Sequence, residues 1–358
     1  MSEPPQIAQG LVVYRDTGGV DAIAEHSRRL VAALEQAGHP ARYIDDGLTS
    51  ARRHAAGPPW ILLQYNPFSF GRWGVAPSLI GDALRLRRRT GARFAVLVHE
   101  PWGDRYDWRS TLMSTYQRVQ LRTLLLGADV VMATTEGRAR MLRRDALYVP
   151  VGSNITPVET PAPTARARLG VSDDTLVLAL FGTGHPSRAL DDAEVAVNAL
   201  AERDGVRSMR VLNLGRGAPP LRLRAGIEVD RPGQLAAEEL SWRLSASDVL
   251  LLPFTDGVST RRTTLMAGLA HGVAIVGSRG ANTDELLTRR PDALVLTPSG
   301  DGAAFARALA DVSADRRRLR AIGEAGRRLY RDQFDWPVIA RRVASALVRT
   351  PQDDERIR

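Results

Sequence analysis

The chain has 358 residues, of which 44% are hydrophobic and 25% are charged, and it contains no cysteine. This composition is typical of a soluble globular protein with room for two domains, and it excludes disulfide bonds and thiolate metal sites. The first ten residues lack the basic and apolar segments of a signal peptide, and no apolar run approaches the roughly 20 residues that span a bilayer. We therefore expect a cytoplasmic protein.

The formal net charge is +9, and all 49 basic residues are arginine. Codon usage can account for arginine in place of lysine, whereas the positive charge itself points to an anionic partner: a phosphorylated substrate, an acidic lipid surface or nucleic acid. The arginines are spread along the chain without a basic stripe interleaved with aromatic residues, so we predict no nucleic-acid partner. Peripheral association with the inner face of a membrane stays open, as does the oligomeric state.

Apolar, β-branched runs alternate with helical patterns in the first half of the chain. The predicted strands are residues 10–14, 60–65, 93–99 and 128–134. Between the first two, residues 20–39 repeat apolar side chains at helical spacing, and Gly38 suits a C-terminal cap. This alternation indicates an α/β domain with a parallel sheet.

A Pro- and Thr-rich stretch, residues 149–170, interrupts the rhythm and is interpreted as a linker. The pattern then resumes, with predicted strands at 175–182, 208–215, 225–230, 248–254, 273–278 and 293–298. We therefore predict two Rossmann-like domains that face each other across a cleft. A ligand of such a pair binds at the carboxyl ends of the strands.

The segment DGVSTRRTTLMAGLAHG, residues 256–272, contains the strongest local anomaly. The helix expected after the strand at 248–254 has Arg261 and Arg262 in its first turn, where each cation opposes the helix dipole by about 0.3–1 kcal/mol. A bound phosphate or diphosphate reverses that cost, because the helix amides and both guanidinium groups then face one anion. The alternative is that both arginines point into solvent or pair with Asp256.

Three further residues of this segment suit the same interpretation. Gly257 permits a tight loop, and Ser259 or Thr260 is predicted to cap the helix.

A second anion candidate is the loop in LFGTGHPSRAL, residues 180–190. Gly182 and Gly184 permit close backbone approach, and Arg188 sits where the next helix is expected to begin. The loop fails as a dinucleotide fingerprint because Ser187 replaces the third glycine. It is interpreted either as an anion cradle or as an ordinary strand-to-helix loop.

The segment VLVHEPWGDRYDW places His99 and Glu100 at the carboxyl end of a buried strand. This pair can orient a sugar or move a proton, although a lone histidine is more often a structural residue.

Two loops of the first half can contact an acceptor. Gly18 and Gly19 join the first strand to the first helix, and their backbone amides can approach a substrate closely or simply form a tight turn. Tyr65, Phe68 and Trp73 form an aromatic loop that can stack on a sugar or an apolar acceptor, or pack between domains.

Several motifs are absent from the sequence. No D-x-D triplet, G-x-x-x-x-G-K-[ST], G-x-S-x-G or H-E-x-x-H occurs, so no metal site is predicted.

Together, the ordered elements resemble the retaining nucleotide-sugar glycosyltransferases of GT-B fold, family 4 type. The resemblance rests on GGVDAIAEHSRRLVAALEQAGH, VHEPW, ADVVMATTEGRARML with VPVGSNI, LGVSDDTLVLALFGTGHPSR, SASDVLLLPFTDGVSTRRTTLMAGLAHGVAIVGS and FDWPVIARRV. It implies an acceptor-binding domain over residues 1–155, a donor-binding domain over 156–333, and a C-terminal helix within 334–358 that crosses back onto the first domain.

Departures from the family pattern concern the donor site. The family's diphosphate-binding arginine falls on Thr183 here, and its lysine falls on Arg188. Its two glutamates, counted back from Gly272, fall on Ser259 and Ala267, so both carboxylates are missing. In this sub-branch Arg261 and Arg262 replace the phosphate cation, with Asp256 nearby, and Glu285 is a further candidate for the donor sugar or ribose.

The resemblance implies a metal-independent retaining glycosyltransferase that uses a nucleoside-diphosphate sugar as co-substrate and no other cofactor. The acceptor hydroxyl attacks from the face that the leaving group vacates, Arg188, Arg261 and Arg262 stabilise the diphosphate, and His99 orients the sugar. The acceptor is a carbohydrate, a lipid-linked molecule or a natural product. The alternatives are a nucleotide-sugar epimerase and an inactive sugar-nucleotide-binding protein.

Overall fold

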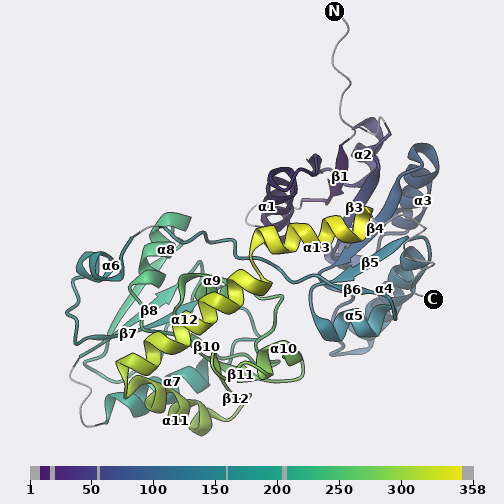
Figure 1. The fold of residues 1–358 in the computed structure, drawn as a ribbon. Coiled ribbons are helices and arrows are strands. Elements are labelled where there is room, and N and C mark those ends of the chain that lie inside the picture. Colours follow the sequence, from purple (N-terminus) through teal and green to yellow (C-terminus); the bar gives the residue numbers. More distant parts are fainter. Residues whose placement is uncertain (1–8, 17–20, 55–56, 159, 204–207, 349–358) are drawn as a thin grey trace, which may run out of the picture. The chain divides into compact units, whose positions relative to one another are not determined.

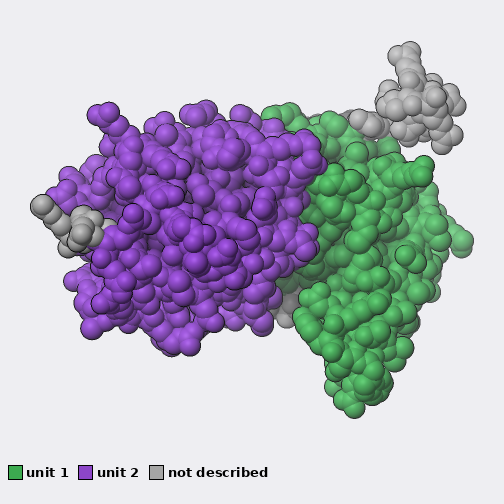
Figure 2. All heavy atoms as spheres, turned by 90° about the horizontal axis from the view of Figure 1, so that it is seen from below, with its two compact units in different colours: residues 1–152, 336–358 green, residues 153–335 purple. Residues whose placement is uncertain are grey.

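The computed structural model describes residues 9–16, 21–54, 57–158, 160–203 and 208–348. It divides the chain into two units, shown in different colours in Figure 2. Unit 1 is Met1–Gly152 with Trp336–Arg358, and unit 2 is Ser153–Asp335. The C-terminal segment therefore belongs to the unit that contains the N-terminus.

Unit 1 is built on a parallel sheet of six strands in the order β2-β1-β3-β4-β5-β6 (Figure 1). The strands are β1 (Gly10–Val13), β2 (Ala41–Ile44), β3 (Trp60–Tyr65), β4 (Arg93–Val98), β5 (Val130–Ala133) and β6 (Leu147–Tyr148). The central strands are apolar runs buried on both faces, as a parallel sheet covered by helices requires.

Helices cover both faces of this sheet. They are α1 (Ala22–Gln36), α2 (Leu48–His54), α3 (Ser78–Thr90), α4 (Trp108–Leu126), α5 (Glu136–Leu142) and α13 (Trp336–Val348), and two 3-10 turns, η1 (Pro67–Ser69) and η2 (Arg72–Gly74), follow β3. Alternate strand residues point to opposite faces: Ile61 and Leu63 pack with α3 and α4, and Leu62 packs with α1 and α13. Gly38 has φ of +81° directly after α1, as predicted for its cap.

Helix α13 completes the core on one face of unit 1. In Figure 1 it lies in yellow beside α1 and the sheet. Ile339, Ala340 and Val343 are fully buried and belong to the same cluster as Val12 of β1. The sheet of unit 1 is therefore covered by residues from both ends of the chain.

Unit 2 contains a second parallel sheet of six strands, in the order β12-β11-β10-β7-β8-β9. The strands are β7 (Leu176–Phe181), β8 (Met209–Leu214), β9 (Glu228–Gly233), β10 (Val249–Leu252), β11 (Ala274–Arg279) and β12 (Val295–Pro298). Strands β8 and β9 follow β7 on one side of the sheet. Strands β10, β11 and β12 then follow one another on the other side of β7. This is the Rossmann strand order, with its reversal of direction between β7 and β10.

The helices of unit 2 are α6 (Ala162–Arg168), α7 (Leu190–Ala201), α8 (Ala237–Ser245), α9 (Thr263–His271), α10 (Glu285–Thr288), α11 (Gly302–Ser313) and α12 (Arg316–Gln333). The interpretation of residues 149–170 as a linker is wrong for part of this stretch, because it contains helix α6. Its Ala165 and Arg166 are buried, and Arg166 pairs with Asp248 at 3.2 Å, which fixes this segment to unit 2.

Among the helices that the structure describes, none combines the length and apolar character needed to cross a bilayer.

Replacing Ile339 by Ala is expected to lower the free energy of unfolding by about 2–5 kcal/mol, because it leaves a cavity between α13 and the sheet of unit 1. Urea denaturation measures this change. Ser345→Ala, an exposed position on the same helix, serves as the control. A loss below about 0.5 kcal/mol for Ile339→Ala would show that α13 is not part of the core.

Candidate functional site

The candidate site lies in unit 2, at the carboxyl ends of β7, β10 and β11. Three loops meet there: residues 182–189 after β7, 253–262 after β10 and 280–284 after β11. The backbone hydrogen bonds that join them are Ala189 N to Pro253 O (3.0 Å), Thr255 N to Ser187 O (2.8 Å) and Asn282 N to Asp256 O (2.9 Å). This is the topological switch point of the sheet, where Rossmann-like sheets bind their ligands.

Two glycines allow the second and third loops to approach each other. Gly257 has φ of +87°, and a Cβ there would clash with Gly280 and Thr283. A Cβ on Gly280 would in turn lie 2.6 Å from the carbonyl carbon of Asp256. Only glycine satisfies both the conformation and the contact at position 257.

Gly182 plays a comparable part in the first loop. It has φ of +136°, and its backbone packs directly against that of Gly215 at the end of β8. A Cβ on Gly182 would lie 3.4 Å from Thr264 Cγ2 and 3.9 Å from Arg188 Nη1. The glycine loop, Arg188 and the first turn of α9 therefore converge on one place.

Arg188 is a half-buried cation without an acidic partner among the described residues. Its Nη1 donates only at 3.5 Å to the Gly182 carbonyl and at 3.4 Å to that of Thr183, and its Nε is buried with no hydrogen-bond partner in the described part of the chain. Burial lowers the pKa of Arg188 to about 10, so it remains charged at neutral pH. An uncompensated buried charge of this kind is costly unless an anion completes the site.

Helix α9 begins at Thr263, two residues later than predicted. Arg262 occupies the N-cap position, and no side chain caps the helix. The expectation that Ser259 or Thr260 caps it is wrong, because Thr260 N and Oγ1 donate to Asp284 Oδ2 at 2.7 and 2.9 Å. The first amides of α9 are left to bind an anion through the positive end of the helix dipole.

Arg261 and Arg262 share the carboxylate of Asp256. Arg261 Nη2 lies 3.1 Å from Asp256 Oδ2, and Arg262 Nη2 pairs with Asp256 Oδ1. Asn282 Nδ2 also donates to Asp256, at 3.0 Å. Burial alone would raise the pKa of Asp256, but the bond from Asn282 and the charges of Arg262 and Arg261 hold it below its usual value.

Pairing with Asp256 was one of the two arrangements foreseen for these arginines. The guanidinium of Arg262 also stacks over the Phe254 ring at 3.6 Å. Asp256, Arg261 and Arg262 therefore form one ion-paired cluster directly before α9.

Asp284, which the sequence did not single out, connects this cluster to α10. It is buried, and through Thr260 it holds the loop that leads into α9. Its position at the N-cap of α10 is the signal that could have revealed it. Glu285, the predicted donor contact, is half exposed and pairs with Arg289.

In unit 1, His99 lies at the end of β4 and is buried. Its Nε2 lies 2.7 Å from Gln64 Oε1, and its ring packs edge-on against His26 with the centroids 5.0 Å apart. Burial, with smaller contributions from His26 and Arg138, lowers the pKa of His99 well below its usual value. The imidazole is therefore neutral at physiological pH. Glu100 pairs with Arg138 at 2.6 Å.

The three aromatic residues predicted to contact an acceptor after β3 lie in two different environments. Tyr65 is fully buried and stacks on Phe70 at 5.9 Å, which corrects the expectation that it contacts an acceptor. Phe68 and Trp73 are exposed. Gly18 and Gly19 lie outside the described residues.

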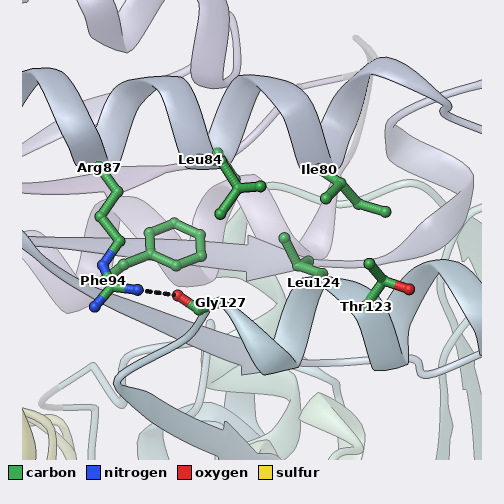
Figure 3. Close-up of a pocket in the computed structure, with 8 residues that line it drawn as sticks. Ile80, Leu84, Arg87, Phe94, Thr123, Leu124 and Gly127 are labelled. Atoms are coloured by element: carbon green, nitrogen blue, oxygen red, sulfur yellow. Dashed lines mark hydrogen bonds between the residues drawn. The ribbon is translucent and has the colours of Figure 1, made fainter.

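A small apolar hollow lies between α3 and α4 (Figure 3). None of its lining residues belongs to the loops after β3, β7, β10 or β11. In Figure 3, Ile80 and Leu84 of α3 point toward Leu124 of α4 over Phe94, near the amino end of β4. Its one charged group, Arg87, bonds the Gly127 carbonyl at 2.9 Å and pairs with Asp129. Nothing in this hollow suggests acid–base chemistry.

No protein-family model matches the chain. A curated relative is the D-inositol 3-phosphate glycosyltransferase of Geodermatophilus obscurus, which is 31% identical over 202 residues. The aligned part is 53% of this chain and 40% of that protein, so the chain spans well under half of the relative's length.

Solved structures resemble nearly the whole chain. Sucrose-phosphate synthase from Thermosynechococcus elongatus has a TM-score of 0.69 at 18% identity, covering 94% of this chain and 98% of its own. Anabaena HepE in complex with UDP and glucose has a TM-score of 0.66 at 14% identity, covering 95% and 99%. A glycosyltransferase from Rickettsia africae has 0.69 at 11%, covering 96% and 100%. The chain has the GT-B fold, with two Rossmann-like units.

Asp256→Asn is expected to lower the free energy of unfolding at pH 7 by about 1–3 kcal/mol, because two guanidinium groups lose their shared carboxylate. The folded-state pKa of Asp256 lies below its usual value of 3.8. The advantage of the wild type is therefore present above that pH and is lost as the pH falls through the folded-state pKa.

Urea denaturation at pH 7 and pH 3 measures this difference, with the exposed Asp174→Asn as the control. A difference between wild type and Asp256→Asn that stays constant between the two pH values would contradict the pairing.

Proposed function

We propose that the chain is a retaining glycosyltransferase that moves a sugar from a nucleoside-diphosphate sugar to an acceptor hydroxyl without a metal ion. The observation that carries the proposal is the half-buried, uncompensated Arg188 beside the uncapped start of α9, at the switch point of the unit 2 sheet. A diphosphate is the ligand that such an arrangement suits best, because it brings the negative charge that Arg188 and the helix dipole lack.

The donor diphosphate would occupy the place where Gly182, Arg188 and Thr264 converge. Arg188 would donate charge-assisted hydrogen bonds, and the amides of Thr263 and Thr264 would bind a phosphate oxygen. The absence of a Cβ at Gly182 leaves room for close approach. In this arrangement three arginines and the helix dipole stabilise the charge that develops on the leaving diphosphate, which is the work a metal ion does in other enzymes.

Asp256 would act by positioning rather than by contact with the donor. It holds Arg261 and Arg262 in place directly before the positive end of α9. Preorganised donors of this kind cost little reorganisation when the leaving-group charge appears.

The similarity to proteins described with UDP and UDP-glucose makes a uridine diphosphate sugar the first donor to test. The similarity to a D-inositol 3-phosphate glycosyltransferase supports transfer to a hydroxyl.

His99 would serve as a neutral hydrogen-bonding group of unit 1 that orients the sugar, since its lowered pKa makes it unsuitable as a cationic acid. An oxygen of the departing phosphate would accept the proton of the acceptor hydroxyl as that hydroxyl attacks. Glu100 and the exposed Phe68 and Trp73 would belong to the acceptor side.

A donor-binding protein without catalytic activity is the second candidate. Ser259 and Ala267, which stand where related enzymes carry glutamates, are both fully buried and bring no carboxylate to the site. Incubation with UDP-glucose and related donors separates the two candidates. Release of UDP supports the enzyme, whereas tight binding without release supports the binding protein.

Arg188→Gln is expected to weaken UDP binding by about 10- to 100-fold, because each lost charge-assisted hydrogen bond contributes about 1.5–3 kcal/mol. The double variant Arg261→Ala with Arg262→Ala should weaken it at least as much, since it also leaves Asp256 uncompensated beside the phosphate. Isothermal titration calorimetry with UDP measures both.

The matched control is Arg290→Gln, which removes a surface arginine that pairs with Asp292 in the same unit. Unchanged affinity in Arg188→Gln, or an equal loss in the control, would rule out the assignment of the diphosphate site.

His99→Ala is expected to lower kcat at least tenfold while the KM for the donor changes less than threefold, because the lost contact orients the sugar and not the diphosphate. Initial-rate kinetics of donor turnover test this. Normal turnover in a folded His99→Ala variant would make His99 a structural residue of unit 1.

A further inference from the structure

One face of α4 is apolar and exposed, although the opposite face already packs on the core of unit 1. The exposed side chains follow one another at helical spacing and are Trp108, Leu112, Tyr116, Val119 and Leu126. Positions 108, 112, 119 and 126 are separated by four and seven residues, so they fall along a single line of the helix. A helix that is apolar on both sides needs a second partner.

The 3-10 turn η2, whose backbone contacts α4 through Gln117, exposes a further tryptophan of unit 1. Trp73 is 59% exposed and is the one non-glycine residue among those described with a positive φ, at +59°. Gln117 of α4 holds it by donating to the Trp73 carbonyl at 2.6 Å. Gln117 is fully buried, so this contact lies on the face of α4 opposite the exposed line.

Positive charge surrounds these apolar residues. Helix α4 contains no Asp or Glu, and Arg105, Arg109, Arg118 and Arg122 pair with no carboxylate of the described residues. Burial, together with the nearby charges of Arg105 and Arg122, lowers the pKa of Arg118, as expected where cations gather without a counterion.

The two carboxylates that flank the start of α4 are engaged locally. Asp107 caps the helix through the Ser110 amide at 2.8 Å, and Asp104 accepts from the Tyr106 hydroxyl at 3.1 Å. Both carboxylates keep their negative charge, so residues 104–122, with four arginines and two aspartates, carry a net charge of +2.

Two arginines also stack on tryptophans, Arg72 over Trp73 at 4.5 Å and Arg109 over Trp108 at 5.2 Å. Tryptophan and tyrosine favour the boundary between lipid headgroups and acyl chains, and arginine can bury its stem there while its charge reaches lipid phosphates. Leu84, which lines the hollow of Figure 3, extends the apolar surface from α4 onto α3.

We propose that this face, defined by Trp108, Leu112, Tyr116, Val119, Leu126 and the arginines 105, 109, 118 and 122, docks unit 1 on the surface of an anionic lipid bilayer. The apolar side chains enter the headgroup region, and the arginines bind the lipid phosphates. The net positive charge of this face selects an anionic lipid surface over an apolar protein partner. The face belongs to unit 1 and is distinct from the donor site proposed in unit 2.

The test is co-sedimentation of the full chain with vesicles of phosphatidylcholine alone or with 30% phosphatidylglycerol. The wild type is expected to bind the anionic vesicles and to remain in the supernatant with the neutral ones. Arg105→Gln, Arg109→Gln and Arg122→Gln combined should weaken binding on the order of a hundredfold, and Trp108→Ser with Leu112→Ser at least about tenfold.

The matched charge control is Arg317→Gln, Arg318→Gln and Arg320→Gln on α12 of unit 2, and the matched apolar control is Val195→Ser with Val229→Ser. Both controls should bind as the wild type does. Because all substituted side chains are exposed, the variants should fold.

The proposal is overturned if the wild type does not bind anionic vesicles, or if it binds neutral vesicles equally well. It is also overturned if the α12 control loses as much affinity as the triple arginine variant of residues 105, 109 and 122. It is also overturned if sedimentation velocity shows a wild-type dimer that the α4 variants dissociate without any vesicle binding. The measurement needs neither donor nor acceptor, so its failure leaves the proposed activity untouched.

Discussion

The geometry of the candidate site depends on one carboxylate. Asp256 accepts hydrogen bonds from Arg261, Arg262 and Asn282, and so ties the loop after β10 to the loop after β11. The close backbone contact between Gly257 and Gly280 permits this arrangement. Two arginines that would repel each other before a helix are thereby held side by side, and the first amides of α9 stay open.

This arrangement leaves an electrostatic imbalance at the site. Arg188 has no carboxylate partner among the described residues, and the positive end of α9 points to the same region. The proposed diphosphate would bring negative charge to Arg188 and to the start of α9. In unit 1, the arginines around α4 present a comparable imbalance on an apolar surface, and there an extended anionic surface fits better than a small anion.

Much of the fold could be predicted because parallel strands buried on both faces are contiguous apolar runs, as in β3 and β10. Strand β2 could not, since only its first and last residues are buried. The start of α9 was misplaced because Thr260, a good local cap, bonds instead to Asp284, 24 residues away. Tyr65 was misassigned because an aromatic residue at a strand end gives no local sign of whether it packs inward.

A crystal structure of the protein with UDP tests the central claim most directly. We expect a phosphate oxygen about 2.7–2.9 Å from a guanidinium nitrogen of Arg188, with a second oxygen bound by the first amides of α9. We also expect that Asp256 still joins Arg261 and Arg262 in the complex. A diphosphate bound away from both Arg188 and α9 would contradict the account.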